Sequence, residues 1–275
     1  DGHQVGTKEE LMKVVDIILR EGRPRGLILS TAATVSPPSL PKTTVWSPGA
    51  RTDEEEQDPL QRGVPRVSSE SGITVLGAPV GSEQYVKEVI ESRIEKIREV
   101  TGLLRLVKDP HCEFVLLRSC LALPKVMFLL RSLDTTPYGN LLEEFDSITR
   151  GALSTILGPP VSDLQWEQAK LPVPMGGAGL RAALDHAPIA YATSYLAAQP
   201  LVRSLLGPRE EESPAALPQP LLDSITVRQG EEATTESLEG LPQKMASRAI
   251  DLNNQSMLLN HFKAEGNVRE MARMA

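Results

Sequence analysis

The fold is decided by residues 86–97, which read VKEVIESRIEKI. Apolar residues recur there at three- and four-residue steps, at Val86, Ile90, Ile94 and Ile97, and Leu104 continues the series. This spacing places the apolar side chains on one face of an α-helix and the charged ones on the others. We therefore expect a helix of roughly 25 residues that starts near residue 82 and is buried along one side.

Further helices are predicted downstream. Residues 110–133 are expected to form a helix that is kinked or broken at Pro124, because proline lacks the backbone N–H that a helix interior needs. Trp166 is expected in a loop, and the glycine-rich residues 175–179 in a tight turn. The remaining predicted helices cover residues 138–157, 180–198, 245–262 and 268–274.

The first 81 residues show a different pattern. Thr7 and Glu10 have the spacing of a capping box ahead of an apolar-periodic segment, so a helix is predicted over residues 7–21. Short strands are predicted where apolar residues cluster between turn residues, at 26–29, 43–46 and 73–76. The predicted fold class is mainly α with a small antiparallel β remnant.

Changes in composition divide the chain into five expected stretches. The first contains the short strands, the next two are helical, the fourth is an acidic, proline-rich linker, and the last is again helical. Their boundaries are 1–81, 82–160, 161–206, 207–241 and 242–275.

Composition also bears on the cellular location of the protein. Its 275 residues include only two cysteines, Cys112 and Cys120, which are too few for a disulfide scaffold and favour an intracellular location, nucleus or cytoplasm. No apolar run approaches the ~20 residues of a membrane-spanning helix, so no membrane is expected as a partner. Lys13 and Asp16 interrupt the first apolar cluster, and we expect no signal peptide. Because Asp1 is not a methionine, the chain is expected to be a piece of a longer one.

The net charge of −7 argues at first sight against nucleic-acid binding. However, residues 53–58 carry −5 and residues 209–240 carry −6, which leaves +4 for the remainder. Residues 98–131 hold six basic and three acidic side chains, a balance compatible with phosphate contacts. The alternative is an ordinary solvated helix surface, which has the same composition.

Motifs of other enzyme classes are missing from the sequence. The four histidines are scattered, and no serine or cysteine stands in a nucleophile-elbow motif. His111, Cys112 and Cys120 lack the paired spacing of zinc ligands. Residues 176–179 are glycine-rich, but the Lys-Ser/Thr ending of a phosphate-binding loop does not follow them. A soluble enzyme of an unrelated class is therefore the weakest hypothesis.

Several motifs follow one another in a recognisable order over about residues 1–200. Asp1-Gly2 precedes the capped helix, which ends at Gly26-Leu27-Ile28-Leu29, and the stretches 42–48 and 72–81 come next. In this order the chain resembles the reverse transcriptases of non-LTR retrotransposons and their reverse-transcriptase-like relatives. In that family a Tyr-x-Asp-Asp turn is followed by a helix, a Gly-Leu-x-Leu-Asn strand, a lysine-containing strand and a Leu-Gly hairpin. The resemblance continues in residues 116–120, 124–126, 128–131, 166–169, 171–172, 176–181 and 185–187.

The resemblance implies the end of a polymerase palm in residues 1–81 and a helical thumb in residues 82–160. Asp1 falls on the second aspartate of the metal-binding pair, where carboxylates converge on two Mg²⁺ ions. Lys42 matches the lysine that the family places near the triphosphate, and residues 72–81 match the hairpin that grips the primer end. The residues expected to contact the RNA template and DNA primer are Gly72, Leu76, Gly77, Gly81, Lys87, Arg105 and Lys125.

The sequence departs from the family pattern in two ways. Ser30 stands where the family has asparagine, and the proline-rich residues 31–41 separate it from Lys42. If this stretch is an untranslated or misassigned insert, Lys42 is displaced, and an exposed lysine without a role is the alternative for it. For residues 72–81 the alternative is a hairpin with a structural role only.

The family's other catalytic carboxylates precede its counterpart of Asp1. We therefore expect this chain to lack polymerase activity alone and to bind no Mg²⁺ tightly. The alternative function is a domesticated helical remnant that acts as a protein-interaction module.

Overall fold

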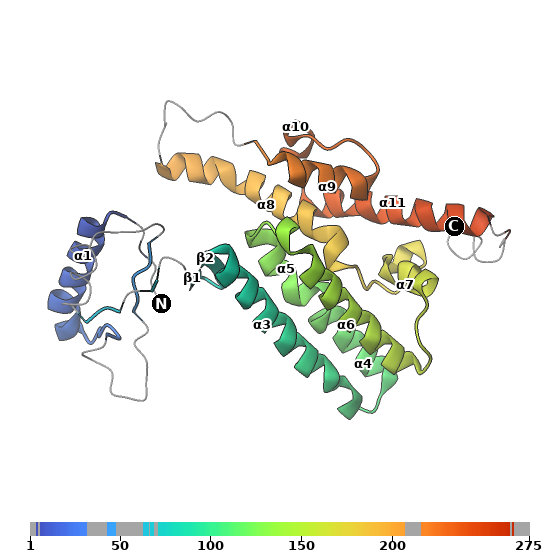
Figure 1. The fold of residues 1–275 in the computed structure, drawn as a ribbon, viewed down its shortest axis with the longest axis horizontal. Coiled ribbons are helices and arrows are strands. Elements are labelled where there is room, and N and C mark those ends of the chain that lie inside the picture. The colour runs from blue at the N-terminus through green and yellow to red at the C-terminus, as the bar shows by residue number, and fades with distance from the viewer. Residues whose placement is uncertain are drawn as a thin grey trace. The chain divides into compact units, whose positions relative to one another are not determined.

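The computed structural model describes residues 4, 6–31, 43–47, 63–65, 67–68, 71–206, 216–264 and 266. The chain divides into two compact units, residues 1–89 and 90–275. Figure 1 labels their helices and strands. In the described part of the chain, no helix is both long and apolar enough to cross a membrane.

The first unit begins with helix α1, Lys8–Ile17, which continues as a π-helical turn, Ile18–Gly22, and a 3₁₀ turn, Arg23–Arg25. The capping box is confirmed: the Glu10 backbone N–H donates to Thr7 Oγ1, and the Glu10 carboxylate accepts from the Thr7 backbone N–H.

Two of the three predicted strands are absent from the described residues. Residues 27–31 have no regular structure, and Leu27 and Ile28 are exposed, so the prediction of a buried strand at 26–29 is wrong. At 43–46 only Val45 forms a bridge, through backbone bonds with Pro65 and Val67. A short apolar run becomes a strand only when a neighbouring segment satisfies its backbone groups.

The third predicted strand is confirmed as one arm of a hairpin. Strands β1, Gly72–Val75, and β2, Ala78–Gly81, pair antiparallel with Gly72 opposite Gly81 and Val75 opposite Ala78. The predicted fold class, mainly α with a small antiparallel sheet, therefore holds for the described residues.

Helix α3, Glu83–Gly102, follows the hairpin and ends five residues short of the expected length. Val86, Ile90, Ile94 and Ile97 are all buried, as their spacing predicts. Glycine and the 3₁₀ turn Leu104–Leu106 end the helix, and Leu104 is buried there.

The second unit continues with α4, Pro110–Leu116, a π-helical turn, Leu117–Leu121, and α5, Leu123–Ser132. The predicted break near Pro124 is confirmed, because Ala122 leaves the helical conformation with φ −73° and ψ −146°. After the 3₁₀ turn Thr136–Tyr138 comes α6, Gly139–Leu157, as expected from its periodicity.

Helix α7, Asp163–Lys170, corrects the prediction that Trp166 lies in a loop. Ser162 and Gln165 form a capping box at its start, and Trp166 packs into the core with residues of α4 and α6. The 3₁₀ turn Val173–Met175 and the glycine-rich turn lead into α8, Ala183–Leu206.

Helix α8 is the centre of the second unit. It packs against α5 and α6 on one side and against α9 and α11 on the other (Figure 1). Helices α9, Gln219–Gln229, α10, Thr235–Leu238, and α11, Gln243–Ala264, complete the unit. Leu221 and Ile225 of α9 are fully buried, so much of the expected linker 207–241 belongs to the core. The helix predicted at 268–274 lies outside the described residues.

Candidate nucleic-acid interface

The hairpin presents its turn to solvent. Leu76 has φ +50° and Gly77 has φ +90°, so both central residues of the two-residue turn adopt positive φ. This turn type prefers Asn-Gly, because a bulky side chain at positive φ is strained. The Leu76 side chain is nevertheless 77% exposed. The turn therefore carries an apolar side chain that neither the turn geometry nor burial requires.

Gly72 and Gly81 have a packing role at the other end of the hairpin. A Cβ on Gly72 would lie 2.3 Å from Tyr85 Cδ1 and 2.7 Å from the Gly81 Cα. A Cβ on Gly81 would lie 2.4 Å from the Gly72 Cα. The two strands can approach this closely only when both residues are glycine, and contact with nucleic acid stays a prediction for them.

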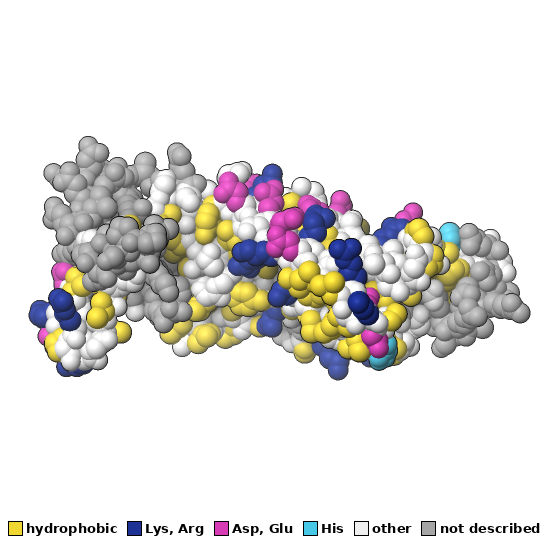
Figure 2. Space-filling view, turned by 90° about the horizontal axis from the view of Figure 1, so that it is seen from below, with side chains coloured by type: hydrophobic (Ala, Val, Ile, Leu, Met, Phe, Trp, Pro, Cys, Tyr) yellow, Lys and Arg dark blue, Asp and Glu magenta, His cyan; other side chains and the backbone are white. Residues whose placement is uncertain are grey.

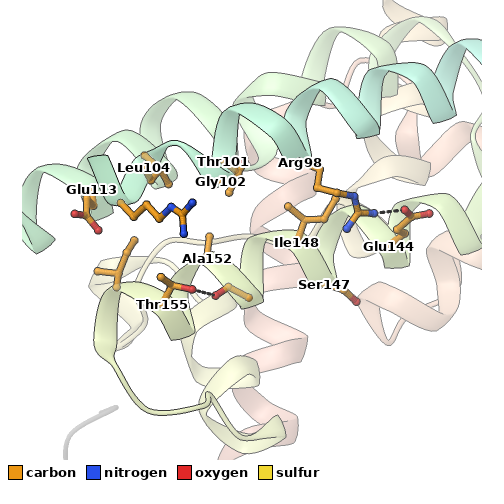
Figure 3. A pocket seen from close by; sticks show the side chains of 13 residues that line it. Arg98, Thr101, Gly102, Leu104, Glu113, Glu144, Ser147, Ile148, Ala152 and Thr155 are labelled. Carbon is orange, nitrogen blue, oxygen red and sulfur yellow. Dashed lines mark hydrogen bonds and ion pairs between the residues drawn. The ribbon is translucent and has the colours of Figure 1, made fainter. Parts of the chain in front are cut away.

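In the second unit, a groove of about 520 Å³ lies between α3, α4 and α6 (Figure 3). Hydroxyl groups and small residues line much of it. Arg98 at one end pairs with Glu144 across the groove and with Glu95 on its own helix at 3.1 Å. The charge of Arg98 is therefore neutralised within the protein.

Arg105 and Glu113 line the same groove, and their charges are not neutralised. Among the described residues, neither side chain has a hydrogen-bond or ion-pair partner. Arg105 is exposed, whereas Glu113 is only 7% exposed. The groove thus holds a guanidinium and a carboxylate that do not pair with each other.

Arg105 is among the residues predicted from the sequence to contact nucleic acid, whereas Glu113 is not. Glu113 stands four and eight residues before the buried Leu117 and Leu121, on the apolar face of its helix. An acidic residue on an apolar face is the signal that could have found it.

The other predicted contact residues do not gather at this groove. Lys125 is exposed in the first turn of α5 and does not line it. Lys87 is exposed near the start of α3, on the part of this helix that belongs to the first unit. Figure 2 shows Lys and Arg side chains interspersed with hydrophobic and acidic ones on the face in view, without one continuous basic patch.

The expected catalytic residues Asp1 and Lys42 lie outside the described residues. Within the described part of the chain, no group of three or more Asp, Glu, His or Cys side chains could hold a metal ion. These residues therefore do not fit the two-Mg²⁺ arrangement of a polymerase, whose ligands are a converging set of carboxylates.

Two buried carboxylates, Asp146 and Asp251, lie around α8, and neither was predicted from the sequence to have a role. Asp146 of α6 accepts bonds from the backbone N–H groups of Ala183, at 2.7 Å, and Leu184, at 3.0 Å. It therefore caps the N-terminus of a helix 37 residues away. Burial raises the pKa of Asp146 to about 7, although the two backbone bonds act in the opposite direction.

The second carboxylate, Asp251 of α11, joins α11 to the start of α8. Arg181 donates to its two oxygens from Nε at 3.2 Å and Nη2 at 2.5 Å. His186 Nε2 lies 3.4 Å from Asp251 Oδ1, while His186 Nδ1 lies 3.1 Å from the Ala182 carbonyl oxygen. Burial acts to raise the pKa of Asp251, but the neighbouring His186 and the bonds from Arg181 outweigh it and hold the pKa below its usual value.

These clusters hold the helices of the second unit together, whereas the hairpin turn and the groove offer groups to a ligand. No protein-family model, curated protein or solved structure significantly matches this chain.

Proposed function

We propose that this chain is the downstream part of a reverse transcriptase of the non-LTR retrotransposon type, and that it contacts the template–primer duplex. In this proposal residues 1–81 are the end of the palm, α3 to α6 form the thumb, and the Leu76–Gly77 turn touches the primer strand. Polymerase chemistry needs a converging set of carboxylates, and the described residues contain no such set, so the proposal assigns them duplex binding and no catalytic step.

The exposed Leu76–Gly77 turn carries the proposal. A leucine at positive φ destabilises the hairpin, and because the side chain is exposed, burial does not offset that cost. A contact with a ligand is a reason to keep such a residue. The order of elements supports the same proposal, since α3, the first helix of the region that the resemblance assigns to the thumb, follows the hairpin after Ser82.

The test is binding of an RNA–DNA hybrid by the full chain over a range of salt concentrations. The triple variant Lys87→Glu, Arg105→Glu and Lys125→Glu should bind more weakly. Its slope of log affinity against log salt should be shallower by about 3, since each lost phosphate contact removes about 0.9. A matched control changes three exposed basic residues of α11 to glutamate: Lys244, Arg248 and Lys263.

The control makes the same change in net charge and should leave the slope nearly unchanged. Leu76→Asn should also weaken binding while relieving the strained turn, so a loss of affinity could not be ascribed to unfolding. Equal affinities for the two triple variants would contradict the proposal.

The alternative is a helical protein-interaction module, which α8 favours. Leu201 and Leu205 stand four residues apart near the end of this helix and are 64% and 76% exposed. In the same titration, a salt slope near zero with no effect of the triple variant would favour this alternative.

A further inference from the structure

The groove between α3, α4 and α6 has the size and the free polar groups of a small-ligand site. Its volume of about 520 Å³ lies within the range of small-molecule pockets. A second hollow, of about 740 Å³ and bounded by α7, α8, α9 and α11, differs in its charges. There Lys170 is already bound by Glu167 at 2.9 Å and Asp185 at 3.1 Å.

The unpaired charges of the first groove define what would bind there. Glu113 is more than nine-tenths buried and has no side-chain partner among the described residues. Its carboxylate oxygens are not among the buried side-chain atoms that lack a hydrogen-bond partner, so they reach the groove, where a ligand that donates hydrogen bonds can bind them. Arg105, which lines the same groove, requires an anionic or accepting group on that ligand.

The two carboxylates of the groove argue against more than one phosphate within it. A strand that ran along the groove would bring phosphates close to both Glu113 and Glu144, whereas one phosphate, of a duplex or of a nucleotide, can reach the exposed Arg105. A single nucleotide can instead place its one phosphate at the guanidinium and its base at the carboxylate. The small side chains leave room for it, since a Cβ added at Gly102 or Gly151 would meet nothing within 4 Å.

We propose that this groove binds one unpaired guanine nucleotide, with its phosphate at Arg105 and the Watson–Crick edge of its base at Glu113. Guanine presents two adjacent N–H donors, N1–H and the N2 amino group, which match the two oxygens of a carboxylate. Adenine and cytosine place an acceptor beside their amino donor, and uracil places its N–H between two carbonyls. Unpaired bases are commonly recognised on this edge by side chains.

Other ligands also carry an anionic group for Arg105 and N–H donors for Glu113. The choice of a nucleotide among these ligands rests on the proposed function. The inference adds to it a base-specific site for a single unpaired residue of template or primer. Thr101 and Ser147 also line the groove and can bond to the sugar, and the Thr155 hydroxyl, which donates to the Gly151 carbonyl oxygen at 3.0 Å, can still accept.

The first experiment is calorimetric titration of the full chain with GMP, AMP, CMP, UMP and inorganic phosphate. GMP should bind about tenfold or more tightly than UMP, a difference of about 1.4 kcal/mol. Inorganic phosphate should bind more weakly than GMP. Equal affinity for the four nucleotides, or no saturable binding of GMP, would overturn the inference.

Three variants locate the site. Glu113→Gln should reduce GMP affinity about tenfold, whereas Glu99→Gln, an exposed change on α3, should not alter it. Arg105→Ala should lower GMP affinity toward that of guanosine, and the exposed Lys108→Ala is its control. Gly151→Leu should block the groove, and because the space is open and leucine favours helix, the fold should persist.

If Glu113→Gln fails to fold, the variants Gly151→Leu and Arg105→Ala still test the site. Unchanged GMP binding by both of them would overturn the inference. The hybrid-binding titration separates this result from the proposed function. Hybrid binding without GMP binding would remove the nucleotide site and leave the proposed function intact. GMP binding without hybrid binding would support the groove site and contradict duplex binding.

Discussion

The start of α8 and the groove between α3, α4 and α6 lie in the same unit. They differ in whether their charged side chains have partners within the protein. Around α8, the carboxylates of Asp146 and Asp251 are buried and bonded to groups from distant parts of the chain. In the groove, Arg105 and Glu113 have no partner among the described residues. A charge that is satisfied within the protein fixes architecture, and one that is not is available to a ligand.

This comparison predicts the largest loss of stability at Asp251. Asp251→Ala should lower the free energy of unfolding by about 3 kcal/mol, because it leaves Arg181 without its acceptor and removes the carboxylate that lies 3.4 Å from the buried His186 Nε2. Urea denaturation followed by far-UV circular dichroism measures the change. Glu99→Ala, an exposed control, should stay within about 0.5 kcal/mol of the parent. A loss below about 1 kcal/mol for Asp251→Ala would mean that this cluster does not fix the fold.

Asp146 should have the next largest effect. Asp146→Ala removes the acceptor of two backbone N–H groups at the start of α8, which should cost about 2 kcal/mol. The matched control is Glu143→Ala, an exposed change on the same helix that should be nearly neutral. Equal urea midpoints for the two variants would contradict the capping role of Asp146.

The spacing of apolar residues was enough to predict the long helices. The series from Val86 to Ile97 is buried as expected, and the break near Pro124 follows from the missing N–H of proline. The prediction of secondary structure failed where strand pairing or tertiary contacts determine the structure. Leu27 and Ile28 form an apolar run without strand structure, and Trp166 lies in a short helix held by its capping box.

The candidate site was predictable only in part, for the same reason. For residues 72–81 the apolar pattern predicts only a strand at 73–76, and the hairpin is an expectation from the resemblance. The cap that Asp146 gives to α8 joins residues 37 positions apart, and Asp251 lies 70 positions from Arg181. No local pattern marks such contacts.

The pH dependence of stability tests the burial of Asp146. Its pKa is raised from the ordinary 3.8 to about 7 by burial, so folding takes up a proton between these values. Its contribution to stability should be fully present below about pH 4 and should be lost as the pH rises to about 7. Asp146→Asn should remove about 1 kcal/mol or more of this dependence between pH 5 and 7. Parallel curves of urea midpoint against pH for the two proteins would contradict it.

The smallest effect is expected in the groove. Arg105→Ala and Glu113→Gln should each change the free energy of unfolding by no more than about 0.5 kcal/mol, because neither removes an interaction among the described residues. Urea denaturation under the conditions used for Asp251→Ala gives the comparison. A loss of about 2 kcal/mol for Glu113→Gln would show that this carboxylate has a structural role like that of Asp146. Near-neutral stability, with altered ligand binding, would place both charges in a binding site.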